Sequence, residues 1–368
     1  MKILIINSVL GFGSTGRIVL ELAKELSLKG NQVRVAYGRL SNSSEEAEEY
    51  GVRIGNNMDV YCHVLFTRLT DKHGLASVRA TKKFLKWADG FDPDILWMHN
   101  IHDYYINYEL LFSWIKSRPG MQVKWTLHDC WAFTGHCSHF TAVDCDKWKN
   151  GCVNCPQLKQ YPKSFVDSSR SNYARKKAAF SGVHNLTIIT PSGWLKEMVK
   201  ESFLSEYPVE IKYNTIDKGL FKPTPSDFKI KNGIQNKKMV LGVANVWNDR
   251  KGLSDFIKLS WLLDNQKNQV VLVGLNEEQI KSLKDLGANI IALPRTKSAS
   301  ELVKIYSAAD VFVNPTYEDT FPSVNMEAEA CGTRVITYDT GGCKETINRT
   351  DSVCVSRNVE AVLAAIDM

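Results

Sequence analysis

Short apolar runs alternate with longer amphipathic segments along most of this chain of 368 residues. Runs such as Lys2 to Asn7 and Val270 to Val273 are too short for helices and predict buried parallel strands. The segment after the first run carries Ile18, Leu22 and Leu26 on one face, which is the spacing of an amphipathic helix. This alternation of strand and helix predicts an α/β architecture with parallel sheets.

The length of the chain predicts about two domains, each large enough to bury its own core. No apolar run approaches the roughly 18 residues that a membrane-spanning helix needs. The first residues, MKILIINSV, predict a strand and not a secretion signal, because no small-residue cleavage site follows them. We therefore expect a cytoplasmic protein.

The net charge of +6 is distributed unevenly. Residues 1–205 contain 26 Lys and Arg against 19 Asp and Glu, whereas residues 206–368 contain 20 against 21. The first half is therefore the one expected to meet an anionic surface or substrate. The excess is too small to favour a dedicated nucleic-acid-binding protein.

The strongest local concentration of positive charge lies between Arg68 and Lys86, where Asp71 is the only acid. Phe84, Leu85 and Trp87 are interleaved with the last of these cations, which predicts a basic amphipathic helix. Such a helix suits either an anionic membrane surface or a solvated position with its aromatic face in the core. The sequence leaves both interpretations open.

The stretch from Ala309 to Glu345 combines several features of a ligand site. An apolar strand is followed by an acidic loop, by a helix that ends at Cys331-Gly332, by a second strand and by Gly341-Gly342. This order places acidic side chains and free backbone N–H groups at one edge of a sheet. In open α/β sheets, ligands bind at the edge formed by the carboxyl ends of the strands.

This stretch resembles the donor-sugar site of family 4 glycosyltransferases, which are retaining enzymes with the GT-B fold. The resemblance implies two Rossmann-like domains that face each other across a cleft. It also implies that Glu327 holds the ribose and that an earlier acid contacts the sugar. Asp319 lies at the expected spacing from Glu327 and Glu318 is one residue further away, so both remain candidates for a catalytic role. The rest of the donor loop consists of Thr320, Phe321 and Pro322.

The resemblance also indicates how the donor diphosphate is held. Family members use an Arg and a Lys for this purpose, and Lys251, just before a Gly, fits the Lys. The usual Arg position holds Asn245 or Val246, so Arg250 is expected to substitute. Two cations beside a helix N-terminus would complement the two phosphate charges. The family's entry to its second domain matches Val209 to Asp217, and we place the domain boundary near residue 206, giving domains 1–205 and 206–368.

The first predicted strand is followed by the glycine-rich loop Gly11 to Gly16. The resemblance implies that Gly13 faces the bound sugar phosphate. The same spacing matches a dinucleotide fingerprint, so an NAD-type oxidoreductase is an alternative function. The next strand ends in Tyr37-Gly38-Arg39, without the acidic residue that would bind the ribose of NAD.

Histidines follow two predicted strands of the first domain. His128-Asp129 comes after one strand, and the resemblance implies that His128 contacts the donor sugar beside the reacting carbon. His99 and His102 follow the other strand. We assign these two, together with Trp131, to the acceptor side.

Residues 130–156 form a cysteine-rich insert. Cys152 and Cys155 have the two-residue gap of half a zinc site, and Cys137 and Cys145 are possible partners, with a nearby His as an alternative ligand. Trp148 is the main apolar residue that we identify, so the insert is expected to have little core of its own. A structural zinc would compensate for this. Free thiols remain an alternative, and a zinc-stabilised nucleic-acid-binding module remains an alternative function.

Together these features predict the retaining transfer of a hexosyl unit. The donor would be a nucleotide-diphosphate sugar, and the acceptor a saccharide or lipid-linked saccharide of cell-surface polysaccharide biosynthesis. We expect no cofactor or divalent metal in catalysis, because side chains supply the cations. No nucleic-acid partner is expected. The protein would be cytoplasmic and could bind the anionic inner leaflet of the cell membrane.

Overall fold

The computed structural model describes residues 1–39 and 45–367 and divides into two compact units. Unit 1 comprises residues 1–212 and unit 2 residues 213–368. The boundary predicted near residue 206 lies just ahead of β7 (Val209–Ile211), the last strand of unit 1. No helix in the described part of the chain is long and apolar enough to cross a membrane.

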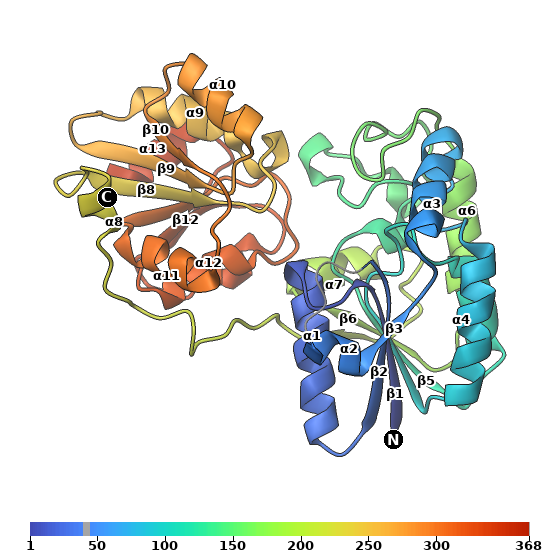
Figure 1. Ribbon diagram of the computed structural model, residues 1–368. Helices are drawn as coiled ribbons and strands as arrows, with labels where there is room; N and C mark the ends of the chain where they lie inside the picture. The colour runs from blue at the N-terminus through green and yellow to red at the C-terminus, as the bar shows by residue number, and fades with distance from the viewer. Residues whose placement is uncertain (40–44, 368) are drawn as a thin grey trace. The chain divides into compact units, whose positions relative to one another are not determined.

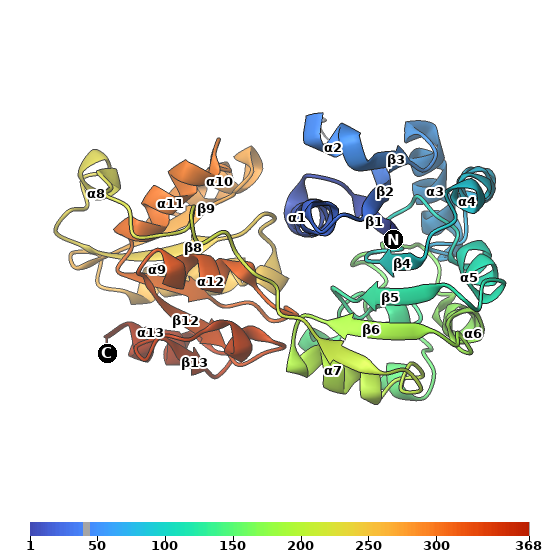
Figure 2. The same ribbon diagram turned by 90° about the horizontal axis from the view of Figure 1, so that it is seen from below.

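Unit 1 contains one parallel seven-stranded sheet in the order β3-β2-β1-β4-β5-β6-β7 (Figures 1 and 2). Its strands are β1 (Lys2–Val9), β2 (Gln32–Arg39), β3 (Gly51–Arg53), β4 (Ile95–Met98), β5 (Gln122–Thr126), β6 (Leu186–Thr190) and β7. Its helices are α1 (Gly13–Leu28), α2 (Glu45–Tyr50), α3 (Asn57–Thr70), α4 (Val78–Phe91), α5 (Tyr108–Lys116), α6 (Ser169–Phe180) and α7 (Gly193–Lys200). The interior strand β1 pairs with both β2 and β4, and separate apolar clusters cover its two faces.

Unit 2 contains a parallel six-stranded sheet in the order β10-β9-β8-β11-β12-β13. Its strands are β8 (Lys238–Val243), β9 (Asn268–Val273), β10 (Ile290–Leu293), β11 (Val311–Asn314), β12 (Arg334–Tyr338) and β13 (Val353–Val355). Its helices are α8 (Phe228–Lys231), α9 (Leu253–Leu262), α10 (Glu277–Asp285), α11 (Ala299–Ala308), α12 (Ser323–Ala330) and α13 (Val359–Asp367). Apolar clusters again lie on both faces of the sheet.

Both sheets reverse their strand order once, which confirms the predicted pair of Rossmann-like sheets. The reversal lies between β1 and β4 in unit 1 and between β8 and β11 in unit 2. Loops that leave adjacent strands at such a point diverge to opposite faces of the sheet and leave a crevice for a ligand. The carboxyl ends of these strands are therefore the places to look for function.

The predicted basic helix between Arg68 and Lys86 is wrong in its extent. Arg68 belongs to α3, which ends at Thr70, and α4 begins only at Val78. Phe84 and Leu85 are buried, and Trp87 packs against the same core. The aromatic face of α4 therefore lies in the core and is not available to enter a membrane.

The cysteine-rich insert has more of a core than the sequence suggested. It contains three short 3-10 turns, η1 (Trp131–Phe133), η2 (Thr141–Val143) and η3 (Lys147–Lys149). Phe133, Phe140 and Trp148 are buried and pack against one another, with ring centroids 4.9–6.3 Å apart. The prediction that the insert would have little core of its own is therefore wrong.

Candidate active site

Two loops at the carboxyl edge of the unit 2 sheet are joined by a backbone hydrogen bond and by a close glycine contact. One carries η4 (Asp249–Lys251) after β8, and the other follows β11. The backbone N–H of Tyr317 donates to the carbonyl oxygen of Arg250 over 2.8 Å. Gly252 has a φ of +74°, and a Cβ there would lie 2.4 Å from the carbonyl oxygen of Pro315. Only glycine fits both the conformation and the space, and the close contact fixes Arg250 and Lys251 beside the second loop.

Lys251 and Asp319 form an ion pair in this site. The Nζ of Lys251 lies 2.5 Å from Oδ2 of Asp319, and both side chains keep about a fifth of their surface exposed. Arg250 donates from Nη1 to the carbonyl oxygen of Glu318 over 2.9 Å. The structure thus brings the two predicted cations and the acidic loop together at one point.

The glycine turn after β12 packs directly on Asp319. The backbone N–H of Gly342 donates to the carbonyl oxygen of Asp319 over 3.1 Å. Gly341 has a φ of +54°, and a Cβ on it would lie 1.9 Å from the same oxygen. This contact explains in physical terms why residue 341 is a glycine.

The two candidates for the first acid have different surroundings. Glu318 is buried, with 2% of its surface exposed. Asp319 is more accessible, accepts the backbone N–H of Phe321 at 3.2 Å and contacts Lys251. Of the two, Asp319 is the carboxylate that a ligand at this edge would meet.

Glu327 is held from two sides on the first turns of α12. The hydroxyl of Tyr306 donates to its Oε2 and the hydroxyl of Ser323 to its Oε1, each over 3.1 Å. Tyr306 is completely buried, and burial followed by the charge of Glu327 raises its pKa well above 10, so it remains a donor. Sequence reasoning missed Tyr306, because a tyrosine on the inner face of a helix looks like an ordinary core residue.

The predicted donor loop leads directly into α12. Thr320, Phe321 and Pro322 are buried, and Pro322 is the N-cap residue of the helix. The ring of Phe321 lies 5.4 Å from that of Tyr213, the first residue of unit 2. The side chain of Pro322 accepts no hydrogen bond. It therefore does not cap the backbone N–H groups in the first turn of α12, which lie at the edge of the sheet.

In unit 1 the glycine-rich loop follows β1 and opens α1. Gly11 and Gly13 have φ values of +76° and +65°, and α1 begins at Gly13 without a side-chain cap. No other atom lies within 4 Å of where a Cβ on Gly13 would stand. The requirement for glycine at this position therefore comes from backbone conformation, and the open space around it can admit a ligand.

His128 follows β5 and is paired with His99, which follows β4. Nδ1 of His99 and Nε2 of His128 are 2.9 Å apart, and the rings stack at 5.2 Å. Burial lowers the pKa of His128 to about 4, with Asp129 opposing this shift. Burial also lowers the pKa of His99 well below 6.5. Both imidazoles are therefore neutral at pH 7, and one ring nitrogen donates to the other.

A second polar chain lies beside this pair. Nε2 of His102 is 3.2 Å from Oδ2 of Asp129, and Nδ1 of His102 is 2.9 Å from the hydroxyl of Tyr161. Burial raises the pKa of Asp129, but His102 and the N–H of Trp131 outweigh it and lower this pKa to about 2. Asp129 is therefore ionised, and the chain ties the strand ends to the loop that carries Tyr161.

Trp131 is almost fully buried, and its ring lies 5.1 Å from that of His102. The backbone oxygen of Trp131 accepts a hydrogen bond from Nζ of Lys176 over 2.6 Å, and the same nitrogen lies 3.5 Å from the centroid of the Trp131 ring. Burial lowers the pKa of Lys176 to about 7. Lys176 gave no signal in the sequence, because it lies in a helix with three other basic residues.

The four predicted zinc ligands line one small cavity of about 10 Å³, beside Phe140 and Trp148. Cys137 and Cys155 share a hydrogen bond that raises the pKa of Cys137 and lowers that of Cys155. In the described residues no group of three or more His, Cys, Asp or Glu side chains is arranged to hold a metal. The four thiols therefore line the same cavity, but they do not have the arrangement of a metal-binding site.

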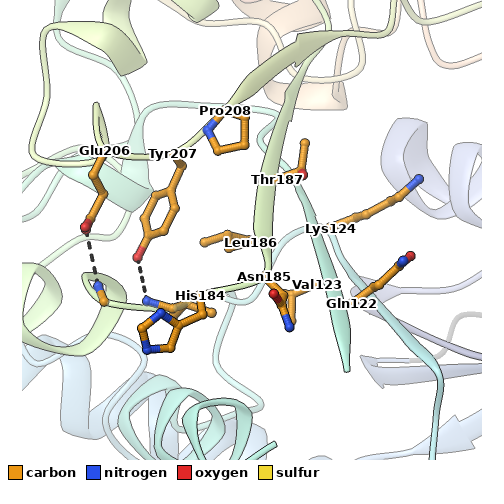
Figure 3. Close-up of a pocket in the computed structure, with 12 residues that line it drawn as sticks. Gln122, Val123, Lys124, His184, Asn185, Leu186, Thr187, Glu206, Tyr207 and Pro208 are labelled. Atoms are coloured by element: carbon orange, nitrogen blue, oxygen red, sulfur yellow. Dashed lines mark hydrogen bonds between the residues drawn. The ribbon is translucent and has the colours of Figure 1, made fainter. Parts of the chain in front are cut away.

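A larger hollow of about 600 Å³ lies elsewhere in unit 1. Figure 3 shows its lining, which includes Gln122 at the start of β5, Leu186 at the start of β6 and Tyr207. It therefore opens at the amino ends of the strands. None of the predicted site residues lines it.

Comparisons with known proteins agree with this geometry. Residues 15–219 match the family model described as Glycosyltransferase Family 4, and residues 226–368 match the model of Glycosyl transferases group 1. A relative from Escherichia coli K12, named as the colanic acid biosynthesis glycosyl transferase WcaC, is 26% identical over 56% of this chain and 52% of its own length. The chain thus spans about half the length of that relative.

A second relative shares a shorter region. The N,N'-diacetylbacillosaminyl-diphospho-undecaprenol alpha-1,3-N-acetylgalactosaminyltransferase of Campylobacter jejuni is 32% identical over 31% of this chain and 30% of its own length. Among solved structures, HepE from Anabaena in complex with UDP aligns over 100% of this chain and 89% of its own, with a TM-score of 0.68 and 15% identity. The predicted GT-B fold is therefore confirmed.

The Glycosyltransferase Family 4 model covers more than half of the chain, and the second model covers most of unit 2. Both sheets have the candidate site residues at their carboxyl edges, where ligands of such folds bind. The chain therefore belongs to glycosyltransferase family 4.

Proposed function

We propose that this protein transfers a hexosyl unit from a nucleotide-diphosphate sugar to a saccharide or lipid-linked saccharide in cell-surface polysaccharide biosynthesis. The observation that carries the proposal is the cation site of unit 2, where Lys251 pairs with Asp319 and Arg250 is anchored beside it. Fixed cations near a helix N-terminus suit a leaving group that carries two phosphates.

The unit 2 residues divide the donor between them. Lys251 and Arg250 bind the diphosphate and stabilise the charge that develops as it leaves. Glu327, oriented by Tyr306 and Ser323, accepts the ribose hydroxyls. Asp319 accepts hydroxyl groups of the sugar, and the N–H groups at the start of α12 add donors to this edge.

Unit 1 contributes a polar edge for the reacting sugar and the acceptor. His128 is neutral, so it can exchange hydrogen bonds with a sugar hydroxyl without adding charge. Gly13 provides close backbone approach, and His102 and Tyr161 form the acceptor side. His99 and Trp131 are buried and act by holding His128 and the adjacent loop.

We further propose that the transfer proceeds with retention and without a divalent metal, since Lys251 and Arg250 supply the positive charge. A lipid-linked acceptor would place the protein at the inner leaflet of the cell membrane. One relative is named for a diphospho-undecaprenol substrate, which supports this acceptor class. The family result favours glycosyl transfer over the NAD-dependent and nucleic-acid-binding alternatives.

A thermal-shift panel of UDP-, GDP- and ADP-sugars tests the proposal on the full chain. A ligand that binds only the folded protein raises the melting temperature, so at least one sugar nucleotide should do so. Lys251→Ala should abolish this shift and cost about 2–4 kcal/mol of transition-state stabilisation in turnover. NMR of the product reports the anomeric configuration, and an inverted linkage would refute retention.

Lys258→Ala is the matched control. Lys258 forms an ion pair with Glu360 at 2.6 Å on the exposed surface of unit 2, so its loss removes a lysine without touching the site. This variant should keep the thermal shift. The proposed function is wrong if no sugar nucleotide stabilises the wild-type protein.

A further inference from the structure

Helix α3 exposes several large apolar side chains while its fully buried positions are polar. Its fully buried side chains are polar, namely His63 and Thr67. Met58, Tyr61, Leu65 and Leu69 are 57–69% exposed. Their spacing puts them on one face of the helix. A surface helix of a globular protein normally turns such a face to the core.

A second segment extends this exposed face. The backbone N–H of Phe165 donates to the carbonyl oxygen of Arg68 over 2.9 Å, so residues 164–166 lie along the last turn of α3. Phe165 is 67% exposed and Val166 is exposed beside it. We call the six apolar side chains together the α3 ridge: Met58, Tyr61, Leu65, Leu69, Phe165 and Val166. Contiguous exposed apolar surface of this kind marks an interaction site more often than a random surface.

The charges around the ridge are mainly positive. The exposed or partly exposed cations of α3, its two ends and the adjoining loop are Arg53, Arg68, Lys72, Lys159, Lys163 and Arg170. The acids near them are Asp59, Asp71 and Asp167. All three accept hydrogen bonds from backbone N–H groups, and Asp71, at the end of α3, is fully buried and paired with His136. An apolar ridge bordered by cations has the chemistry of an interfacial membrane element.

The ridge lies at the functional end of unit 1. Figure 1 shows α3 at the end of the sheet opposite the N-terminus, beside the loops that follow the strands. Tyr161, whose hydroxyl contacts His102, precedes Phe165 by four residues. Four residues span at most about 14 Å of extended chain. An acceptor held in a bilayer at the ridge would therefore lie close to the acceptor side of unit 1.

We propose that the α3 ridge docks unit 1 on an anionic phospholipid bilayer, with the apolar side chains in the headgroup region and the cations against lipid phosphates. The inference deepens the proposed function, because it names the surface that would present a lipid-linked acceptor. It stands on the exposed side chains of α3 and does not depend on the donor site. The ridge also replaces α4 as the candidate membrane-binding surface, because the aromatic face of α4 is buried in the core.

Sedimentation of the full chain with vesicles tests this proposal. Vesicles that contain phosphatidylglycerol should bind the wild-type protein at low salt, and vesicles of phosphatidylcholine alone should bind it much more weakly. Near 1 M salt the Debye length falls to about 3 Å, so the binding to anionic vesicles should drop. The double variant Leu65→Ser, Phe165→Ser should bind anionic vesicles at least about tenfold more weakly.

Leu28→Ser is the control, since Leu28 is a solitary exposed leucine at the end of α1. It should leave vesicle binding unchanged. The mutated side chains are exposed, so all variants should keep the wild-type melting temperature and bind a nucleoside diphosphate equally well. If the wild-type protein does not bind nucleotide at all, this result counts against the proposed function and not against the ridge.

Three results would overturn the inference. The first is an absence of anionic vesicle binding by the wild-type protein. The second is equal binding by the wild-type protein and the double variant. The third is a wild-type dimer that becomes a monomer in the double variant without any binding to vesicles, because the ridge would then be an interface between two copies of the chain.

Discussion

At the scale of single residues, the two acids of the proposed donor site are held by different groups. Asp319 contacts a lysine ammonium, whereas Glu327 receives two hydroxyl donors. An acid that faces a cation is placed for a ligand that can displace this cation. An acid that is oriented by neutral hydroxyls keeps its orientation when the ligand arrives. These surroundings match the proposed division between sugar and ribose.

Glu327→Ala should therefore weaken the binding of both the nucleoside diphosphate and the intact donor. The loss of hydrogen bonds to a charged group predicts a cost of about 1.5–3 kcal/mol for each ligand. Asp319→Asn should weaken the intact donor selectively, because only that ligand carries the sugar. Calorimetry with both ligands measures the four affinities.

Glu360→Ala serves as the control for these variants, since Glu360 is an exposed acid that pairs with Lys258. It should bind both ligands as the wild-type protein does. Equal losses for both ligands at Asp319 and Glu327 would contradict the division of roles.

At the scale of elements, the sequence predicts much of the order of strands and helices. It does not predict the side-chain contacts that hold these elements together. The strand-helix alternation and the order from β11 to Gly342 follow from local patterns of apolar residues and glycines. The division between α3 and α4 was missed because cations occur on both sides of the break. Contacts such as Tyr306 to Glu327 and Lys176 to Trp131 join segments 21 and 45 residues apart, and no local pattern specifies them.

The glycine turn on Asp319 can be tested by substitution. Gly341→Ala places a methyl group against a backbone oxygen and also strains a positive φ. We expect it to cost about 2–5 kcal/mol of unfolding free energy and to abolish binding of the donor sugar. Denaturant unfolding and calorimetry measure the two effects.

Gly287→Ala is the matched control for this substitution. Gly287 also has a positive φ, of +62°, but no atom lies within 4 Å of where its Cβ would stand. It should lose only the conformational part, about 1–2 kcal/mol, and keep its donor affinity. Similar losses in both variants would show that the contact with Asp319 is unimportant.

The cysteine-rich insert carries a second prediction at this scale. A cavity of about 10 Å³ can hold one small occupant, and its four thiols are weak partners for water. Gly135 donates its backbone N–H to Sγ of Cys152 over 3.1 Å, and such a donor would help to orient a sulfur that binds a metal. We propose that the four sulfurs turn into the cavity around one zinc ion.

Metal analysis of protein purified without added zinc should then give about one zinc per chain. The variant Cys152→Ser should lose the metal and lower the melting temperature, whereas Cys62→Ser, at an exposed cysteine on α3, should change neither. Metal-free wild-type protein with full stability would refute the zinc proposal and favour free thiols.

At the scale of the whole molecule, the two units differ in how they titrate. All eight histidines lie between His63 and His184, and therefore in unit 1. Burial lowers the pKa of His63 to about 3 and that of His128 to about 4, and it lowers those of His73 and His99 well below 6.5. The unfolded chain therefore binds protons below pH 6.5 that folded unit 1 does not.

Unit 1 should consequently lose stability as the pH falls from about 6.5 to 4. Each of these histidines contributes a slope of up to about 1.4 kcal/mol per pH unit across the window between its unfolded and folded pKa values. Urea unfolding at pH 7.5, 6 and 5, followed by tryptophan fluorescence, should show a falling midpoint for unit 1. Unit 2 has no histidine, so this loss of stability should be confined to unit 1. A midpoint of unit 1 that stays constant over this pH range would contradict the prediction.

The ion pair between Lys251 and Asp319 has a consequence for turnover. In the proposed reaction Lys251 moves to the diphosphate of an arriving donor, so Asp319 would lose its cation and would accept the hydroxyl groups of the sugar instead. After transfer the sugar has gone, and the spent nucleoside diphosphate offers Asp319 nothing in return. Reforming the pair then competes with the spent nucleotide for Lys251. In the proposed cycle the same two side chains would both admit the donor and help to expel the product, and each turnover would restore the ion pair.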